Sequence, residues 1–352
     1  MARAGKRPVE DEQLHLFVPP SSSEAPARRT QQVSPAPLLP DVEALAASLP
    51  ETIRLGTSSW SFPGWEGLIY DRPASQATLS REGLPLYSQH PLLRTVGVDR
   101  TYYRPMTTAQ FADYAAQVPE TFRFLVKAHE YCTLAGFGDH PRYGARRGQP
   151  NRLFLDPHYA TQEVIGPFTD GLKDKAGPLL FQFSPQDDTC LTGSGSFVER
   201  LYQFLDRLPR GPVYTVELRN TTLFTPEYVD ALSAVGACHC LNGHPSMPPV
   251  RKQAALVQPE RSQAVVIRWM QVRHLSYQAA KHKYVPFNRI VDADPTSRRA
   301  VAELCLDGSV RQQPTYVIVN NKAEGCAPLS IFQLARQIVE TRSDAGARGA
   351  LN

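Results

Sequence analysis

Residues 213–220 read Val-Tyr-Thr-Val-Glu-Leu-Arg-Asn, a short run of β-branched and aromatic residues that ends in charged and polar side chains. Every second residue from Tyr214 to Leu218 is apolar, which is the alternation of a strand with one face packed on helices. Glu217 and Arg219 lie on the opposite face, where same-side neighbours are about 7 Å apart. The run therefore predicts a strand that carries paired charges at its carboxyl end.

Similar runs recur along the chain and are separated by segments with helical periodicity. The predicted strands are residues 53–58, 94–99, 122–128, 178–183, 213–218, 237–241, 264–269 and 315–320. The predicted helices are residues 41–49, 81–89, 109–118, 157–173, 196–207, 226–235, 295–306 and 328–340, with a weak helix at 248–256. Strands that alternate with helices form a parallel sheet, and eight of them close a barrel. The predicted fold class is α/β, a single (β/α)8 TIM-like barrel.

Local signals support this reading and weaken the alternative, an open doubly wound sheet. Asp156, Thr225 and Asp294 each precede a proline and mark helix starts, and Asp41 is predicted to cap the first helix. No predicted strand is followed by a glycine-rich nucleotide-binding turn, which an open sheet of the nucleotide-binding kind would carry.

Composition sets the class of protein and its domain boundaries. The chain has 352 residues, of which 42% are hydrophobic and 20% charged, and a net charge of +4, too small an excess to indicate nucleic-acid binding. Eight of its 31 prolines lie in the first 50 residues. We predict a disordered N-terminal tail over residues 1–40, a barrel over 41–341 and a flexible C-terminus over 342–352.

Targeting signals are lacking in this sequence. No window has the roughly 18 apolar residues of a membrane helix, and the basic N-terminus is followed by acidic residues where a signal peptide would be apolar. The six cysteines are scattered without a C-x-x-C pair, and we expect Cys238 and Cys240 to pack in the core. We therefore expect a cytoplasmic protein without membrane contact.

The active site of a β/α barrel forms at the carboxyl ends of its strands, and here those ends are polar. Three residues are predicted to be catalytic: Glu217, Lys127 and Asp99. Seven are predicted to bind substrate: Arg219, Arg268, Asn320, Asn321, Trp60, Tyr103 and Gln182. Strand parity points Lys127, Glu217, Arg219 and Arg268 into the barrel, where unpaired charges are costly.

Two interpretations of these charges remain open. They could form a structural salt-bridge layer that fills the barrel. Alternatively, Lys127, Arg219 and Arg268 hold a phosphate or carboxylate, while Glu217 acts as general acid/base with Asp99 as a second carboxylate. Two carboxylates also permit glycosidase-like chemistry, and Lys127 could form a Schiff base.

No metal or cofactor is predicted, because His129, His239 and His244 do not form an obvious ligand set. The loop at residues 129–156 is unusually long and rich in glycine and arginine. Such a loop is either mobile and solvated or a lid over the site that contacts phosphates.

Six short motifs occur in order along the predicted barrel. They are Gly-Thr-Ser-Ser-Trp at 56–60 with Trp65, Gly67 and Tyr70; Thr-Tyr-Tyr-Arg at 101–104; Phe-Leu-Val-Lys-Ala at 124–128; Leu-Phe-Gln-Phe at 180–183; Val-Glu-Leu-Arg at 216–219; and Asn320-Asn321 with Gly325 and Ala327. Over roughly residues 53–340 the chain resembles the domain-of-unknown-function 72 (YecE-like) family. The resemblance implies a TIM barrel and a family-type pocket, but no reaction, since the family's activity is not established.

The chain departs from the family pattern at several usual histidines. Leu134, Asn220 and Met270 stand where the family usually has histidine, and residues 97–100 read Gly-Val-Asp-Arg in place of Glu-Ile-Asn-Ser. These departures argue against metal or histidine-based chemistry.

The N-terminal tail carries a second resemblance, at Gln13-Leu14-His15-Leu16-Phe17. It is similar to the Q-L-x-L-F peptide with which bacterial DNA-processing proteins bind the DNA polymerase sliding clamp. Gln13, Leu14, Leu16 and Phe17 are the predicted partner-binding residues, with the apolar side chains entering a pocket of the clamp. The alternative is a short apolar patch that docks on the protein's own barrel.

Together these observations predict a DNA-associated enzyme with hydrolase-like chemistry, for instance in DNA repair, that processes a phosphate-bearing substrate and is recruited to the clamp. One alternative is a metabolic enzyme acting on a small anionic or sugar-like molecule. The other is a non-catalytic adaptor tethered to the clamp.

Overall fold

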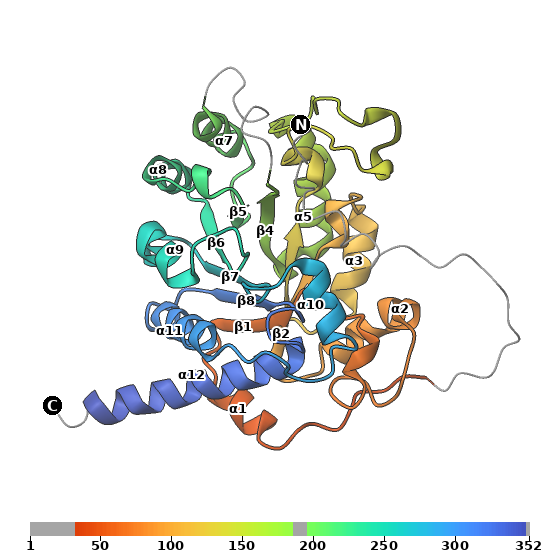
Figure 1. The fold of residues 1–352 in the computed structure, drawn as a ribbon, viewed down its shortest axis with the longest axis vertical. Helices are drawn as coiled ribbons and strands as arrows, with labels where there is room; N and C mark the ends of the chain where they lie inside the picture. The colour runs from red at the N-terminus through yellow and green to blue at the C-terminus, as the bar shows by residue number, and fades with distance from the viewer. Residues whose placement is uncertain (1–31, 186–195, 350–352) are drawn as a thin grey trace, which may run out of the picture.

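The chain is described over residues 32–185 and 196–349 by a computed structural model. Eight parallel strands close into a barrel in chain order, each paired with the next and the last with the first (Figure 1). They are β1 (Ile53–Thr57), β2 (Leu93–Val98), β3 (Arg123–Lys127), β4 (Ala176–Phe183), β5 (Tyr214–Leu218), β6 (Cys238–Asn242), β7 (Val265–Trp269) and β8 (Thr315–Val319). The predicted α/β barrel is confirmed.

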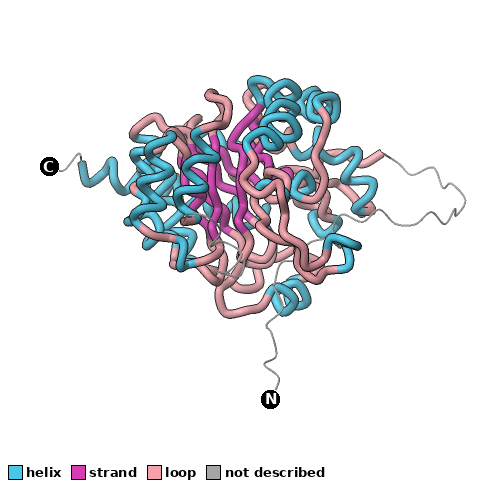
Figure 2. Tube along the Cα trace, turned by 90° about the horizontal axis from the view of Figure 1, so that it is seen from above, coloured by secondary structure: helices cyan, strands magenta, loops and turns pink. Residues whose placement is uncertain are grey.

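Helices flank the strands on both sides, as the side view of the barrel shows (Figure 2). They are α1 (Val42–Ser48), α2 (Gln76–Tyr87), α3 (Thr108–Ala116), α4 (Pro157–Tyr159), α5 (Gly166–Leu172), α7 (Phe197–Asp206), α8 (Pro226–Val235), α9 (Val250–Val257), α10 (Tyr277–Tyr284), α11 (Pro295–Val310) and α12 (Ala327–Gly349). In the described segments, no helix is long and apolar enough to cross a membrane.

Three of the four predicted helix caps are confirmed. The side chains of Asp156, Thr225 and Asp294 accept hydrogen bonds from backbone N–H groups of the first turns of α4, α8 and α11. Asp41 is the exception, because its backbone is left-handed with φ 68° and its side chain makes no cap bond. Its backbone carbonyl instead accepts from Leu45 N at 2.8 Å.

Other predictions about helices need correction. The predicted helix at 157–173 is interrupted by a π-helical segment, Ala160–Ile165, between α4 and α5. The weak helix at 248–256 is α9, and α10, in the loop after β7, was not predicted. The apolar periodicity of α10 is weak, because its sequence contains Gln278 and three basic residues, Lys281, His282 and Lys283.

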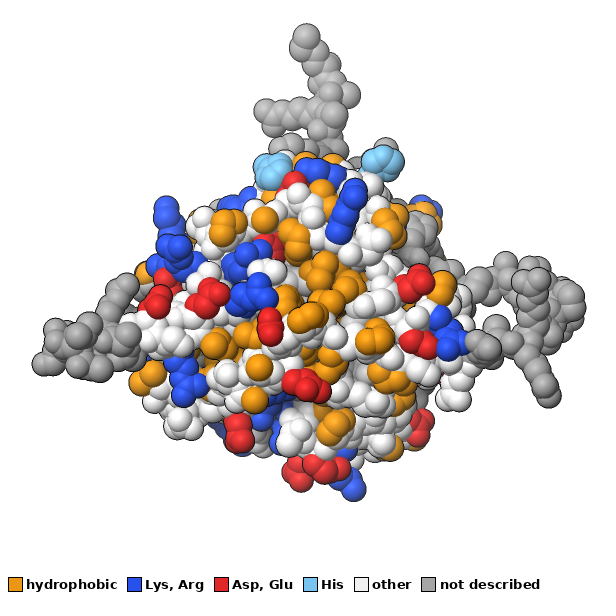
Figure 3. All heavy atoms as spheres, turned by 90° about the horizontal axis from the view of Figure 1, so that it is seen from below, with side chains coloured by type: hydrophobic (Ala, Val, Ile, Leu, Met, Phe, Trp, Pro, Cys, Tyr) orange, Lys and Arg blue, Asp and Glu red, His pale blue; other side chains and the backbone are white. Residues whose placement is uncertain are grey.

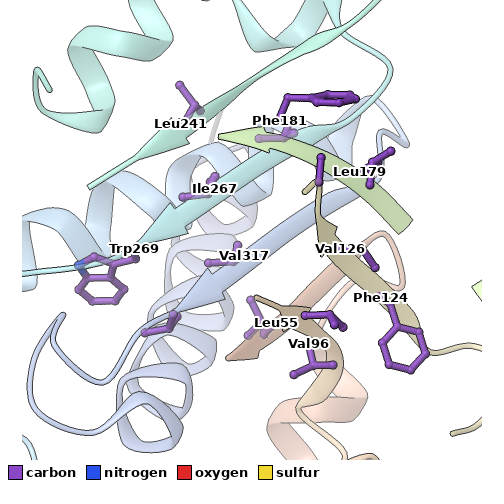
Figure 4. Packing of buried hydrophobic residues seen from close by; sticks show 14 of the residues in the cluster. Leu55, Val96, Phe124, Val126, Leu179, Phe181, Leu241, Ile267, Trp269 and Val317 are labelled. Atoms are coloured by element: carbon purple, nitrogen blue, oxygen red, sulfur yellow. The ribbon is translucent and has the colours of Figure 1, made fainter. Parts of the chain in front are cut away.

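The core has two layers, and strand parity separates them. Between strands and helices lie apolar side chains such as Phe124, Val126, Phe181 and Val317 (Figure 4). Inside the barrel lie Leu125, Leu180, Cys238, Cys240, Ala264, Val266, Tyr316 and Ile318. The predicted core packing of Cys238 and Cys240 is therefore confirmed, and the five cysteines that the structure describes are buried and unpaired.

Described residues that fall within the two predicted tail segments take part in the fold. Ala36 N donates to Ile69 O at 3.0 Å and Asp71 N to Ser34 O at 2.9 Å, and the side chains of Val33 and Ala36 are buried. Residues 33–36 of the predicted tail therefore pack against the barrel through two apolar side chains. At the other end, α12 continues to Gly349 rather than ending near 341, since no proline interrupts it. Residues 13–17 lie outside the described residues.

Candidate functional site

Glu217, on the inner face of β5, forms the centre of a buried ion-pair network. Its Oε1 accepts from Arg219 Nε at 2.8 Å, and its Oε2 accepts from Arg268 Nη1 at 2.6 Å. Arg268 comes from β7, two strands away, and curvature of the closed barrel brings its inner face next to that of β5. Both oxygens of this carboxylate are therefore occupied by charge-assisted hydrogen bonds.

Gln182, on the inner face of β4, holds the two guanidinium groups together. Its Oε1 accepts from Arg219 Nη2 at 2.7 Å and from Arg268 Nη1 at 3.2 Å. Its Nε2 donates to Ser184 Oγ at 3.3 Å, which fixes the orientation of the amide. A buried amide that accepts two hydrogen bonds from arginines fixes the positions of both.

Asp99 and Lys127 complete the network more loosely. Asp99 Oδ2 lies 3.5 Å from Arg268 Nη2, and Asp99 Oδ1 lies 3.8 Å from Lys127 Nζ. Burial lowers the pKa of Lys127, and the carboxylate of Asp99 opposes this shift. The Asp99 side chain is 10% exposed and that of Glu217 is 0% exposed, so Asp99 is the more accessible carboxylate.

Lys322 is a further residue of this site that the sequence-based selection missed. It lies in the loop after β8, where its Nζ donates to Asn320 Oδ1 at 2.9 Å and lies 4.3 Å from the centroid of the Tyr277 ring. Burial lowers its pKa to about 7; Asp99 opposes the shift, and cations including Arg268 add to it. We call Asp99, Lys127, Gln182, Glu217, Arg219, Arg268 and Lys322 the barrel mouth. The signal that could have found Lys322 is its position two residues after Asn320 at a strand end.

Among the described residues of the barrel mouth, basic side chains outnumber carboxylates. The basic side chains are Lys127, Arg219, Arg268 and Lys322, and the carboxylates are Asp99 and Glu217. Burial, followed by the neighbouring Arg268, lowers the pKa of Arg219 well below the usual value. Because arginine stays protonated in proteins, this direction reflects the cost of gathering positive charge away from water.

Two of the residues predicted to bind substrate, Asn321 and Trp60, have side chains that contact other parts of the barrel and its helices. Asn321 Oδ1 accepts from Trp65 Nε1 at 3.2 Å and from Ala327 N at 2.8 Å, which anchors the start of α12. Trp60 packs edge-on against Tyr114 of α3, with ring centroids 5.3 Å apart. The inward and outward alternation of strand side chains does not predict the direction of these two residues, because they follow the strands, where the loop backbone turns.

Asn320 and Tyr103, which were also predicted to bind substrate, lie at the edge of the ion-pair network. Asn320 donates to Ser58 Oγ at 3.0 Å and accepts from Lys322. The ring of Tyr103 is half-buried below the guanidinium of Arg142, 5.2 Å from its centroid. Burial and then the charge of Asp99 raise the pKa of Tyr103, which places its phenol near the barrel mouth.

Aromatic and ionic contacts hold the long loop at residues 129–156 in place. Arg142 Nη2 lies 2.7 Å from Glu130 Oε2, and Arg146 lies over the ring of Phe137 at 5.4 Å. Phe137 and Tyr143 are buried. Both arginines therefore have partners within the loop, and contact with a phosphate would compete with those partners.

The three histidines that could have indicated metal chemistry are neutral at pH 7, and two of them, His129 and His239, are buried. Burial lowers the pKa of His129 and of His239 to about 4, and burial together with nearby arginines lowers that of His244 to about 2. His239 points out of the barrel, where it contacts Tyr228 OH at 2.8 Å. Over residues 32–185 and 196–349, no group of three or more His, Cys, Asp or Glu side chains is placed to hold a metal ion.

A closed eight-stranded parallel barrel with charged side chains gathered at the carboxyl ends of its strands defines a TIM-barrel protein. This chain belongs to the family described as "Protein of unknown function DUF72", whose model matches residues 54–350.

Solved structures of the same family share the fold. A DUF72 family protein from Enterococcus faecalis is 17% identical with a TM-score of 0.55, over 81% of this chain and 95% of that one. A DUF72 family protein from Thermotoga maritima is 18% identical with a TM-score of 0.53, over 81% of this chain and 98% of that one. No curated protein matches this chain.

Proposed function

We propose that this protein is an enzyme whose barrel mouth binds a small molecule carrying a phosphate or carboxylate group. The observation that carries the proposal is the charge imbalance: among the described residues, Lys127, Arg219 and Arg268 share one buried site with two carboxylates. Positive charge in excess of its partners is costly away from water, and an anionic ligand offsets that cost through charge-assisted hydrogen bonds.

A purely structural salt-bridge layer accounts less well for this arrangement. In such a layer we would expect equal numbers of positive and negative groups, all paired at short ion-pair distances. Here the contacts of Glu217 are 2.6 and 2.8 Å, whereas those of Asp99 are 3.5 and 3.8 Å. The loosely held, more accessible Asp99 leaves Lys127 and Arg268 available to an incoming anion.

The same contacts divide the roles of the two carboxylates. Both oxygens of Glu217 accept from guanidinium groups, so we assign it to positioning Arg219 and Arg268 rather than to proton transfer. Asp99 is then the general acid/base of hydrolase-like chemistry on a phosphate-bearing substrate. Gln182 positions both arginines through its Oε1.

The charges on one face of the molecule do not form the basic surface that an extended polyanion would need. On the face of the molecule drawn in Figure 3, basic and acidic side chains are interspersed around apolar ones. A nucleic-acid-binding surface would instead gather Lys and Arg on one face. The excess of basic side chains described above instead lies at the barrel mouth, which suits a small anionic ligand.

We predict that inorganic phosphate binds the wild-type chain and that Arg219→Lys weakens this binding about tenfold or more. Lysine keeps the charge but loses the planar fork that holds Glu217 Oε1 and Gln182 Oε1 together. Calorimetric titration of the full chain at constant ionic strength measures the effect. The matched control is Arg210→Lys, at a surface pair with Asp206, which should leave binding unchanged. Equal affinities in both variants, or no binding to the wild type at millimolar phosphate, would leave only the structural layer.

Association with DNA through a sliding clamp is a second, separate proposal, and it depends on Gln13-Leu14-His15-Leu16-Phe17. Fifteen residues (18–32) lie between Phe17 and Val33, the first residue known to be buried against the barrel. At full extension they span at most about 50 Å, enough for the peptide to reach a partner beside the barrel. This proposal also places the protein in the cytoplasm.

The full chain is expected to bind a bacterial sliding clamp with micromolar affinity. Replacing Leu16 and Phe17 together with alanine should abolish that binding, because each apolar anchor contributes roughly 1.5–3 kcal/mol when buried. His15→Ala is the control, since the motif leaves that position open. Calorimetry measures binding, and thermal unfolding checks the barrel. No binding by the wild type, or a barrel destabilised by the double substitution, would overturn the proposal.

A further inference from the structure

Lys322 is a buried lysine of the barrel mouth that is not needed for the anion binding proposed above. It lies just beyond β8, 7% exposed, with its Nζ between Asn320 Oδ1 at 2.9 Å and the face of Tyr277 at 4.3 Å. Among the described residues, no carboxylate lies within ion-pair distance of this amine. The nitrogen is thus enclosed with one neutral oxygen acceptor and an aromatic ring.

This environment favours the neutral amine. An ammonium group in a buried site without a counter-ion is costly, and the charges of Lys281, Arg268 and Arg219 add to that cost. The pKa of Lys322, about 7, follows from burial first and from these charges after it, against the opposing charge of Asp99. A neutral lysine amine carries a free electron pair and is a nucleophile.

We propose that Lys322 condenses with the carbonyl group of a small anionic aldehyde or ketone to form a Schiff base. The inference rests on the proposed function, because Arg219, Arg268 and Lys127 would hold the anionic group of that substrate beside the amine. It names the substrate class: a carbonyl compound that also carries a carboxylate or a phosphate.

The step balances without an oxidant or reductant. The nitrogen of Lys322 bonds to the carbonyl carbon, the carbonyl oxygen takes up a proton and the nitrogen releases one, giving a carbinolamine. The hydroxyl group then leaves as water with a second proton, and the nitrogen electron pair closes the C=N bond. In total, one amine, one carbonyl and one proton give one protonated imine and one water. Asp99, whose charge acts on Lys322, is the group available to pass these protons.

Lys127, the other buried lysine of the barrel mouth, fits this role less well. Its side chain is 1% exposed, its Nζ lies 3.8 Å from the carboxylate of Asp99, and the ring of Tyr102 lies 4.8 Å from the same nitrogen. The neighbouring carboxylate of Asp99 favours the ammonium form of Lys127 and opposes the lowering of its pKa by burial. Lys127 is therefore suited to binding an anion, and Lys322 to attacking a carbonyl carbon.

The test uses the full chain with glyoxylate, a small anionic aldehyde, and sodium cyanoborohydride, which reduces imines in place. Peptide mass mapping then gives the rate of modification at each lysine at pH 7. Lys322 should be modified at least tenfold faster than exposed Lys252. At pH 7 a pKa of about 7 leaves about half of the amine neutral, against roughly 0.04% for an ordinary lysine. The rate at Lys322 should level off above pH 8 while that at Lys252 continues to rise.

A neutral aldehyde of similar size, acetaldehyde, separates this inference from the proposed function. If glyoxylate modifies Lys322 faster than acetaldehyde does, with both rates taken relative to Lys252 in the same sample, the result supports both the nucleophile and the anion site. Fast modification of Lys322 by both aldehydes alike supports the nucleophile and overturns the anion site. Calorimetric binding of glyoxylate with Lys322 modified no faster than Lys252 overturns the nucleophile and leaves the anion site standing. Mapping on the wild-type chain needs no variant; Lys322→Arg should remove the modification and Lys252→Arg should leave it.

Discussion

Replacing Glu217 with glutamine is expected to lower the free energy of unfolding by about 3–5 kcal/mol, the cost of leaving a buried ion pair without one partner. The change removes the charge but keeps the size of the side chain. It leaves Arg219 and Arg268, which now reach Glu217 at 2.8 and 2.6 Å, as adjacent buried cations. Equilibrium unfolding in urea measures the loss.

Asp206→Asn provides the matched control. Asp206 pairs with Arg210 at 2.9 Å, but the two side chains are 47% and 67% exposed, so its loss should cost between 0 and about 1 kcal/mol. The proposed anion site adds a second expectation: phosphate should raise the stability of the Glu217→Gln variant more than that of the wild type, because it supplies the missing negative charge. A loss no larger than that of the control would mean that the guanidinium groups do not depend on the carboxylate.

The second large effect is expected at Gly56, in β1. A Cβ atom built on Gly56 would lie 1.9 Å from the backbone oxygen of Thr95 and 2.6 Å from its carbonyl carbon. The β1–β2 register shifts between Leu55 and Gly56, and glycine at such an irregularity allows close backbone approach. Gly56→Ala should therefore force the two strands apart and cost about 3 kcal/mol or more. Urea unfolding of the purified variant measures it.

Gly138→Ala is the comparison that isolates this clash. A Cβ atom at Gly138, in the long loop, would meet nothing within 4 Å, so the substitution should change stability by less than about 0.5 kcal/mol. If Gly56→Ala and Gly138→Ala were equally stable, the close approach of β1 to β2 would not constrain the barrel.

Much of the fold could be predicted because the signals are local. The strand at 213–218 alternates so regularly that its inner and outer faces can be assigned from sequence, and β5 (Tyr214–Leu218) has that assignment. Helix starts with a capping residue before proline were equally readable. By contrast, α10 lacks a clear apolar period, and residues 33–36 are ordered by contacts with residues 69–71. Neither feature has a local signal.

The candidate site divides in the same way. Lys127, Glu217, Arg219 and Arg268 were assigned to one barrel end because they occupy inward positions near the ends of β3, β5 and β7. Trp60, Asn321 and Lys322 follow their strands, where the alternation has ended. Their directions depend on loop backbone and on partners such as Tyr114, Trp65 and Tyr277.

The sequence by itself determined a parallel eight-stranded barrel and the presence of charges inside it, because the two-residue period of a strand assigns each side chain to a face. The tertiary structure alone decided how those charges combine. Barrel closure brought Arg268 to one oxygen of Glu217 and Arg219 to the other, and the loop after β8 turned the amine of Lys322 back toward the same end. Such pairings depend on distances between strands far apart in the chain, which no local pattern of residues encodes.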